Sequence, residues 1–293
     1  MFDLTGRVVV ISGGNAGIGR GFARGIARAG GDVVVWGRRA EKNAEAAADL
    51  RQFGGRVLTQ EVDVSDEARV VSAMAEAVEA LGRVDGVIAN AGMMTSTGTF
   101  LDMTTDAWRE LLAVNQDGAF YMMREGARHM KQRFDAGDPG GSLLFCASLS
   151  ALTGSPGMQH YNASKGAMAA MSRGIAVEAG RYGIRCNVVC PGYTVSESVN
   201  LPNDHPLMDH VRRYSPMGRM GTPDDFEGIG VYFMSELSRF HTGDLVIVEG
   251  GWMANAGKDT RPDPPPMLAT GEIVIFFRMS SITSSIGCRL RSR

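Results

Sequence analysis

The chain has 293 residues, with 30 Lys and Arg against 32 Asp and Glu and a formal net charge of −2. Hydrophobic residues make up 44% and charged residues 21%, which argues against a disordered or fibrous protein. The balanced charge gives no broad field that would attract nucleic acid or an anionic membrane surface, so neither partner is expected.

Seven short β-branched runs alternate with helical patterns over about the first 250 residues. The runs are almost continuously apolar, as expected for parallel strands covered by helices on both faces. The predicted strands lie at residues 7–12, 32–36, 57–62, 84–89, 142–147, 184–189 and 244–248. With right-handed crossovers they predict an α/β fold with a single doubly wound, Rossmann-type parallel sheet.

The intervening segments predict helices. One apolar stripe with a period of 3.6 residues consists of Val70, Val71, Met74, Val78 and Leu81. Residues 222–225 (TPDD) combine an N-cap hydroxyl, a first-turn proline and two acids, which indicates a helix start. Long helices are expected around residues 106–131 and 161–182.

Residues 254–293 depart from this pattern. They contain a proline-rich link at residues 262–266 and an apolar run at residues 271–279. Six basic and three acidic residues give this segment a net charge of +3, which leaves −5 on residues 1–253. The sequence predicts one folded domain over residues 1–253 and an irregular, partly disordered extension over residues 254–293. The alternative is an arm that packs on another subunit or binds an acidic partner.

The cysteines and histidines predict neither a disulfide framework nor a metal site. Four cysteines are too few to staple a chain of this length, and Cys146, Cys186 and Cys190 lie in or beside apolar runs. These three are expected to be reduced core thiols. None of the five histidines has metal-ligand spacing. Because neither a signal peptide nor a membrane-length apolar run is recognised, a cytoplasmic protein is expected.

A glycine-rich turn follows the first predicted strand. Residues 12–19 read SGGNAGIG, and a helix is expected to begin near Ile18. Gly13 allows the tight turn, while Gly17 and Gly19 let the backbone approach a pyrophosphate and let the helix pack on the strand. A glycine cluster alone could be a flexible turn, but its place between a strand and a helix predicts phosphate binding.

The end of the second strand predicts which dinucleotide binds. An NAD site usually has an acid there, which accepts hydrogen bonds from the adenosine ribose. This chain has Gly37 at that place, followed by Arg38 and Arg39. Two guanidinium groups would suit a 2′-phosphate, so NADP(H) is favoured over NAD(H). The alternative is that the two arginines only solvate a helix start.

A second group of residues has the chemistry of proton transfer. Tyr161 and Lys165 are four residues apart, so on a helix the phenol and the ammonium share a face. Such a pair is common on helix surfaces. Ser148, however, closes the fifth predicted strand, at the edge of a parallel sheet where ligands bind.

Together these motifs resemble the short-chain dehydrogenase/reductase family. The match covers residues 4–253, and the residues beyond Met253 have no counterpart in the family pattern. The motifs are SGGNAGIG at residues 12–19, Asp63 with Val64, NAG at residues 90–92, Asn115, Ser148, YNASK at residues 161–165, and Pro191 with Gly192. The resemblance implies hydride transfer between a nicotinamide cofactor and a carbonyl or secondary alcohol.

The resemblance implies roles for four catalytic residues. Tyr161 would be the general acid on reduction and the base on oxidation. Lys165 would bind the nicotinamide ribose hydroxyls and place its charge beside Tyr161. Ser148 would hydrogen-bond the substrate oxygen. Asn115 would keep a water between Lys165 and solvent, which completes a proton relay.

The resemblance also implies a cofactor site. Asp63 would accept from the adenine amino group, Asn90 and Gly92 would line the adenosine side, and Pro191 and Gly192 would pack near the nicotinamide. The expected set is Gly13, Asn15, Gly17, Ile18, Gly19, Arg38, Arg39, Asp63, Val64, Asn90, Ala91, Gly92, Tyr161, Lys165, Pro191, Gly192, Thr194 and Ser196. Ser12 and Ser196 stand where the family often has threonine, and Glu249 replaces a common aspartate that we interpret as structural.

The substrate side is expected to be apolar and rich in thioethers, which suits a hydrophobic or adaptable ligand. Its predicted residues are Ser148, Ser150, Met158 and Tyr193, with Met93, Met94 and Leu149 nearby. His205 and His210 follow in the region where the family closes a lid over substrate, although a solvated loop is the preferred interpretation. A 3-oxoacyl thioester, a sugar or polyol, and a cyclic ketone are all candidate substrates.

Three functions follow as hypotheses. The first is an NADP(H)-preferring oxidoreductase, with NAD(H) as the alternative cofactor. The second is a catalytically silent NADP(H)-binding sensor, against which the intact catalytic set argues because binding alone would not need it. The third is an interaction protein that works through its basic C-terminal segment. Family members are usually dimers or tetramers, so a homotetramer is expected, with a homodimer as the alternative, and the two long helices would form a shared bundle.

Overall fold

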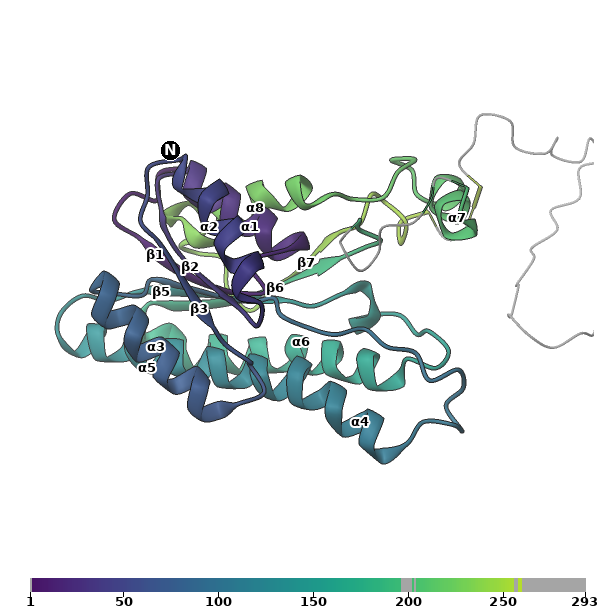
Figure 1. Ribbon diagram of the computed structural model, residues 1–293, viewed down its shortest axis with the longest axis horizontal. Helices are drawn as coiled ribbons and strands as arrows, with labels where there is room; N and C mark the ends of the chain where they lie inside the picture. The colour runs from purple at the N-terminus through teal and green to yellow at the C-terminus, as the bar shows by residue number, and fades with distance from the viewer. Residues whose placement is uncertain (1, 196–201, 203, 256–257, 260–293) are drawn as a thin grey trace, which may run out of the picture. The chain divides into compact units, whose positions relative to one another are not determined.

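The computed structural model describes residues 2–195, 202, 204–255, 258 and 259 (Figure 1). Residues 1–260 form one compact unit, to which all the described residues belong. The proline-rich link and the apolar run predicted at residues 271–279 lie outside the described residues.

Seven parallel strands form one sheet in the order β3-β2-β1-β4-β5-β6-β7. The strands are β1 (Val8–Ser12), β2 (Asp32–Gly37), β3 (Val57–Glu61), β4 (Gly86–Ala89), β5 (Gly141–Cys146), β6 (Ile184–Pro191) and β7 (Leu245–Val248). This architecture confirms the predicted doubly wound sheet. The strand order reverses between β1 and β4, and in such sheets ligands bind beside the carboxyl ends of the strands at that point.

Helices cover both faces of the sheet (Figure 1). One face carries α1 (Gly17–Arg28), α2 (Ala40–Arg51) and α8 (Glu227–Met234), and the other carries α3 (Glu67–Leu81), α5 (Gly118–Asp135) and α6 (Gln159–Ala179). Two shorter helices are α4 (Thr105–Leu112) and α7 (Pro206–Tyr214). No helix within the described residues is long and apolar enough to cross a bilayer.

The alternation of strand side chains divides the core into two layers. In β1, Val8 and Val10 pack with the α3, α5 and α6 side, while Val9 and Ile11 pack with the α1, α2 and α8 side. Successive strand residues point to opposite faces, so both sets are buried because helices lie on both sides. The continuous apolar runs in the sequence follow from this arrangement.

The apolar stripe predicted for α3 is partly wrong. Val70 and Met74 are buried as expected, but Val71 is 41% exposed, and the small side chains of Ala73 and Ala77 complete the buried face. Adjacent helix positions are about 100° apart, and Val71 is turned toward solvent while Val70 faces the sheet. Alanine lets the helix approach the strands closely. The predicted stripe contained only large apolar side chains and therefore left these alanines out.

The helix start predicted at residues 222–225 is confirmed. A 3-10 turn at Pro223–Phe226 leads directly into α8, and the Asp225 carboxylate accepts from the backbone N–H of Thr222 at 2.7 Å. This bond satisfies a backbone donor at the helix start that has no partner within the helix.

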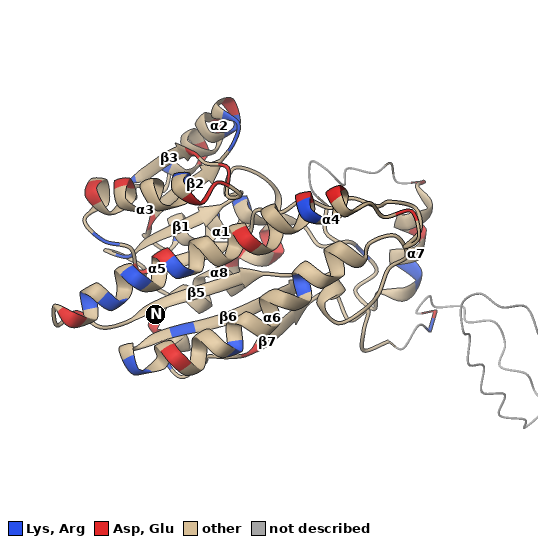
Figure 2. Ribbon diagram, turned by 90° about the horizontal axis from the view of Figure 1, so that it is seen from below, with Lys and Arg blue, Asp and Glu red and all other residues tan. Residues whose placement is uncertain are grey.

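The first long predicted helix contains an irregular turn. It runs from α4 through a π-helical turn at Ala113–Asp117 into α5, without a break. Along α5, basic residues predominate on the ribbon, with acidic residues among them (Figure 2). Arg124 and Arg128 both pair with Glu125, and Lys131 pairs with Asp135, so much of the charge on this helix is balanced locally.

Candidate active site

The predicted site residues gather at the carboxyl edge of the sheet. Ser12 ends β1, Ala89 ends β4 just before Asn90, Cys146 ends β5 two residues before Ser148, and β6 ends at Pro191. Parallel strands bring these ends to the same edge, where the strand order reverses.

The glycine-rich turn is built for close approach of a ligand. Gly13 and Gly17 have φ of +63° and +51°, which side chains disfavour. A Cβ on Gly19 would lie 2.2 Å from the backbone oxygen of Gly13, so only glycine fits there. Helix α1 then begins without a side-chain cap and without an acid in its first turn, which suits an anion such as a pyrophosphate.

Hydrogen bonds fix the segment after β4 against this turn. The Ser12 hydroxyl accepts from the backbone N–H groups of Asn90 and Ala91 at 3.1 and 3.0 Å. The Asn90 amide donates to the backbone oxygen of Ser12 at 3.0 Å. Serine at this position therefore keeps the hydroxyl that a threonine would supply.

The end of β2 is shaped by two buried asparagines. The Asn15 amide donates to the Asn43 side-chain oxygen at 2.7 Å, and the Asn43 amide donates to the backbone oxygen of Gly37 at 2.9 Å. Beyond Gly37, the exposed guanidinium of Arg38 lies 3.9 Å from the Asp63 carboxylate. Asn43 was not among the predicted site residues, because its role depends on contacts between β2 and α2.

Asp63 follows the end of β3, which pairs with β2, and faces Arg38 there. The Ser65 hydroxyl donates to its carboxylate at 2.7 Å and is the main cause that holds the pKa of Asp63 below its ordinary value. Burial, the second-largest effect, acts in the opposite direction, while the backbone N–H of Ser65 and the charge of Arg38 lower the pKa further. Asp63 is therefore an ionised acceptor. Its neighbour Val64 is buried, and a Cβ on Gly118 would lie 2.7 Å from it.

Tyr161 and Lys165 lie one turn apart near the start of α6. The Lys165 ammonium is 5.7 Å from the centre of the Tyr161 ring. The Lys165 residue is only 4% exposed, and its ammonium donates to the backbone oxygen of Cys146 at 2.9 Å. A buried cation held by a carbonyl keeps further N–H groups that a polar ligand can accept from. Ribose hydroxyls would fit this donor.

Asn115 is fully buried in the π-helical turn. Its side-chain oxygen accepts from the backbone N–H of Met93 at 2.8 Å, and its amide donates to the backbone oxygen of Met93 at 2.9 Å. The same amide lies 3.3 Å from the Ser164 hydroxyl, which donates to the backbone oxygen of Tyr161 at 2.8 Å. Asn115 thus links the loop after β4 to the helix that carries Tyr161.

Ser148 begins a 3-10 turn at Leu149–Ala151. Its hydroxyl oxygen accepts from the backbone N–H of Ser150 at 3.2 Å. The hydroxyl hydrogen can still be donated to a substrate oxygen, since the turn uses only the acceptor.

The three described cysteines are free and buried, as predicted. Burial raises the pKa of Cys146 and of Cys190 to about 11, and it raises the pKa of Cys186 further. Thiols of this kind are inert at neutral pH, and within the described residues no His, Cys, Asp or Glu cluster could hold a metal ion.

The segment after β6 brings an aromatic group to the predicted substrate side. Tyr193 meets Trp252 and His210 edge to face, each at 6.2 Å between ring centroids. Burial raises the pKa of Tyr193. Met158 directly precedes α6 and is half-buried. Trp252 was missed because its contact with Tyr193 joins segments far apart in the sequence.

The remaining predicted residues of this region have structural contacts. The Thr194 hydroxyl donates to the backbone oxygen of Gly192 at 3.1 Å, and the His205 ring caps the start of α7. The Glu249 carboxylate accepts from the backbone N–H groups of Gly251 and Met253, so it serves the turn after β7 as expected. Ser196 lies outside the described residues.

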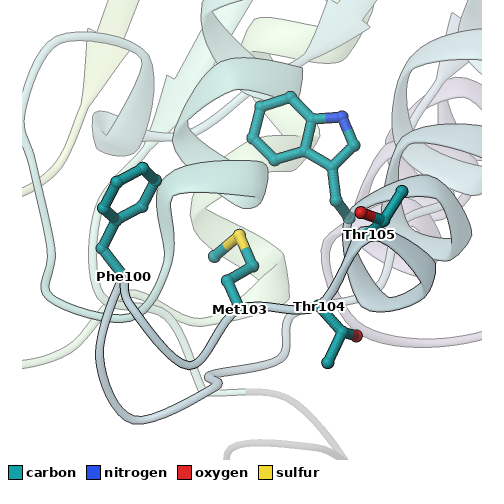
Figure 3. A pocket seen from close by; sticks show the side chains of 5 residues that line it. Phe100, Met103, Thr104 and Thr105 are labelled. Atoms are coloured by element: carbon teal, nitrogen blue, oxygen red, sulfur yellow. The ribbon is translucent and has the colours of Figure 1, made fainter.

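A small hollow lies in the loop that leads into α4 (Figure 3). It has a volume of about 220 Å³ and is lined by Phe100, Met103, Thr104, Thr105 and Trp108. None of the predicted site residues lines it, so it does not identify the substrate position.

Comparisons with known proteins show which family and which structures the chain is similar to. Residues 13–253 match a family model described as enoyl-(acyl carrier protein) reductase. An L-rhamnose 1-dehydrogenase (NAD(P)(+)) of Sphingomonas is 32% identical over 255 residues, and an NADP-dependent (R)-specific alcohol dehydrogenase of Lentilactobacillus kefiri is 36% identical over 255 residues. Each alignment covers 86% of this chain and 98% of the relative. The structure of a putative short-chain alcohol dehydrogenase from Sinorhizobium meliloti superposes with a TM-score of 0.81 at 30% identity, covering 87% of this chain and 99% of the other.

Proposed function

Because this chain belongs to the short-chain dehydrogenase/reductase family, and is an NAD(P)-dependent oxidoreductase acting on alcohols or carbonyls, we propose that Tyr161 is its general acid and base. The observation that supports this role most strongly is the buried ammonium of Lys165 one turn from the phenol. The catalytically silent alternative is disfavoured, because relatives along nearly the whole domain are enzymes.

Each of the proposed catalytic residues has its own role in the reaction. The nicotinamide, when bound, supplies or accepts the hydride. The Ser148 hydroxyl holds the substrate oxygen, and Tyr161 gives its proton to that oxygen on reduction or takes one on oxidation. Lys165 holds the ribose hydroxyls and keeps a positive charge beside Tyr161. Asn115 fixes the adjoining loop and helix, and holds a water that passes protons toward solvent.

The proposed cofactor preference is for NADP(H). Arg38 is exposed at the end of β2, Arg39 is its neighbour, and Gly37 leaves no carboxylate to repel a 2′-phosphate. The remaining cofactor contacts are proposed for the glycine-rich turn, for Asp63 with Val64 and for residues 90–92. Pro191, Gly192, Thr194 and Ser196 are proposed to complete the nicotinamide end.

The proposed substrate is a small secondary alcohol or the corresponding ketone, or a sugar. The named relatives act on L-rhamnose and on an alcohol, and Tyr193 with Trp252 provides aromatic edges of the kind that pack against ring carbons. Ser150 and Met158 are proposed to line the same side.

The proposed assembly is a homotetramer, with a homodimer as the alternative. The helices α5 and α6 cover the same side of the sheet, and each exposes an apolar side chain. Val177 on α6 is 87% exposed, and Phe120 on α5 is 42% exposed. Burying these side chains between copies would remove apolar surface from water. We further propose that the enzyme is cytoplasmic and that residues 1–253 are its catalytic domain, with residues 254–293 as an appended extension.

The test of the catalytic proposal follows the absorbance of the reduced nicotinamide, with NADPH or NADH supplied for carbonyl substrates and NADP+ or NAD+ supplied for alcohols and sugars, in separate assays. The panel would contain ketones, aldehydes, alcohols and sugars, assayed with wild type and Tyr161→Phe, which keeps the ring and removes only the hydroxyl. Turnover that is lost in Tyr161→Phe while NADPH binding is retained supports the proposal. Equal rates for the two proteins would contradict it.

A further inference from the structure

His160 is a fully buried side chain that the catalytic scheme does not use. It precedes Tyr161 in the first turn of α6, and its Nε2 lies 3.1 Å from the Thr95 hydroxyl. Its Nδ1 is buried and has no hydrogen-bond partner within the described part of the chain. A buried polar atom without a partner lowers stability, so an apolar side chain would serve folding better. A role in positioning neighbouring groups therefore explains the His160 imidazole better than a contribution to the stability of the fold does.

Thr95 belongs to the loop after β4, which is fastened at three points. Asn115 holds Met93 through two hydrogen bonds, and His160 holds Thr95. Thr97 donates to the backbone oxygen of Gly157 through its N–H at 3.1 Å and through its hydroxyl at 3.3 Å. A Cβ on Gly157 would lie 2.6 Å from the backbone oxygen of Gly98, so this loop and the approach to α6 are in close contact.

We propose that His160 is a positioning residue for Tyr161, and that its bond to Thr95 closes a ring of hydrogen bonds around the start of α6. The inference rests on the proposed role of Tyr161. One arc of the ring is the Ser164 hydroxyl, which joins the backbone oxygen of Tyr161 to the Asn115 amide. The other arc runs from Asn115 through Met93 and along the loop to Thr95, and returns through His160.

This cycle of hydrogen bonds fixes the Tyr161 phenol against the loop that carries the predicted substrate contacts Met93 and Met94. Proton transfer requires the phenol and the substrate oxygen to meet within hydrogen-bond distance, and misplacement by about 1 Å can lower a rate by about a hundredfold. The cofactor contacts proposed above lie mainly at the glycine-rich turn and at Lys165. Loss of the ring should therefore lower kcat more than cofactor affinity.

Thr95 offers the cleanest test, because its side chain is exposed and its replacement leaves the core intact. Thr95→Val removes the hydroxyl at nearly constant shape, whereas Thr95→Ser keeps it. Thr99→Val is the matched control, since the Thr99 hydroxyl on the same loop donates to Asp102 instead. We expect Thr95→Val to lower kcat by about tenfold with an unchanged Kd for NADPH, and both other variants to stay within about twofold.

His160 is tested by two amides of different reach. His160→Gln places an amide nitrogen near the position of Nε2 and can still bond Thr95, while His160→Asn reaches only as far as Nδ1. We expect Gln to retain most of kcat and Asn to lower it as much as Thr95→Val does. Combining His160→Asn with Thr95→Val should then add little, because both changes open the same ring.

The outcomes separate the two proposals. A wild-type protein with no turnover on the whole panel overturns the proposed function, and this inference with it. An active wild type with unchanged kcat in Thr95→Val overturns the positioning role alone. Equal losses in His160→Gln and His160→Asn, or fully additive losses in the double variant, also overturn it. If His160→Asn fails to fold, the three threonine variants decide.

Discussion

The amide nitrogen of Asn15 occupies the space that a side chain at Gly37 would need. A Cβ added to Gly37 would lie 2.2 Å from Asn15 Nδ2 and 2.5 Å from Asn43 Oδ1. Both asparagines are buried and bonded to each other, so neither can move aside without losing a partner. The two asparagines thus leave no room for a side chain at position 37, and the proposed cofactor also favours glycine there.

This contact predicts how cofactor preference responds to mutation. Gly37→Asp alone should fail to give tight NADH binding and should lower the melting temperature, because the new side chain displaces the asparagine pair. The Kd values for NADH and NADPH, measured by fluorescence, check this. Tight NADH binding by a fully stable Gly37→Asp protein would show that the asparagines yield easily.

The two arginines after Gly37 should carry the discrimination between the cofactors. Changing Arg38 and Arg39 together to serine should raise the Kd for NADPH by about tenfold or more and leave that for NADH nearly unchanged, since charge-assisted bonds to the 2′-phosphate are lost. Arg51→Ser, at the exposed far end of α2, is the control. If the Kd values for NADPH and NADH rose equally, the arginines would attract either cofactor by their charge and would not recognise the 2′-phosphate.

The turn at the start of α1 should tolerate no side chain at Gly19. Gly19→Ala should abolish NADPH binding or unfold the turn, because its Cβ would overlap the Gly13 carbonyl. Gly228→Ala is the matched control, since a Cβ there meets nothing within 4 Å. That change in α8 should raise the free energy of unfolding by about 0.5–1 kcal/mol. Calorimetry and cofactor titration measure both effects, and normal NADPH binding by Gly19→Ala would contradict the prediction.

The ionisation of Asp85 should make the free energy of unfolding depend on pH in the acid range. Burial alone would raise its pKa, but hydrogen bonds from Arg83 and the Val8 N–H, with the charge of Arg133, hold the pKa below the ordinary 3.8. A lowered pKa in the folded state stabilises the protein above the unfolded value, and this contribution is lost as pH falls below about 4. The free energy of unfolding, measured across this range, should therefore fall with decreasing pH.

Asp85→Asn tests this assignment. It leaves the guanidinium of Arg133, 9% exposed, without a buried counter-charge, and should cost about 3–5 kcal/mol at neutral pH. Asp135→Asn, which breaks the surface pair with Lys131, should cost less than about 1 kcal/mol. A similar cost for the two changes, measured by denaturant unfolding, would show that the buried network contributes no more than a surface pair.

The core thiols should be protected from modification. In a Cys288→Ser variant, which removes the cysteine outside the described residues, a thiol reagent at neutral pH should label nothing in the native state and all three remaining cysteines in denaturant. Burial causes this, since it keeps Cys146 and Cys190 protonated and inaccessible. Rapid native labelling would indicate that the edge of the sheet opens.

The sequence predicted the sheet well because each strand is buried on both faces. A run such as Val8–Ile11 has no polar alternation, and the turns at Gly13 and Gly30 require positive φ, so strand limits are marked locally. The family resemblance supplied the site residues in a similar way, because most of its motifs follow the ends of strands and the others lie within short helical segments. Both kinds of signal lie within short segments of chain.

The missed features depend on contacts between distant segments. The bond of His160 to Thr95 and the meeting of Tyr193 with Trp252 leave no local pattern, because each residue is ordinary in its own segment. The π-helical turn around Asn115 was also missed, since its residues fit a continuous helix equally well. In the structure, Asn115 bonds to both backbone polar groups of Met93 from within this turn, a contact between segments far apart in the sequence.

That turn also affects how the long helix tolerates changes in length. Before it, α4 contacts α6, and after it, α5 contacts α3, so one continuous helix serves two different neighbours. A π-helical turn holds about one residue more than an α-helical turn, so removing one residue from Ala113–Asp117 would let the turn become α-helical and keep α4 and α5 close to their present orientations. The same deletion would shift Asn115 relative to Met93 and Ser164, to which it is bonded. The length of this turn is therefore constrained by the placement of Asn115 more than by the packing of the two helices.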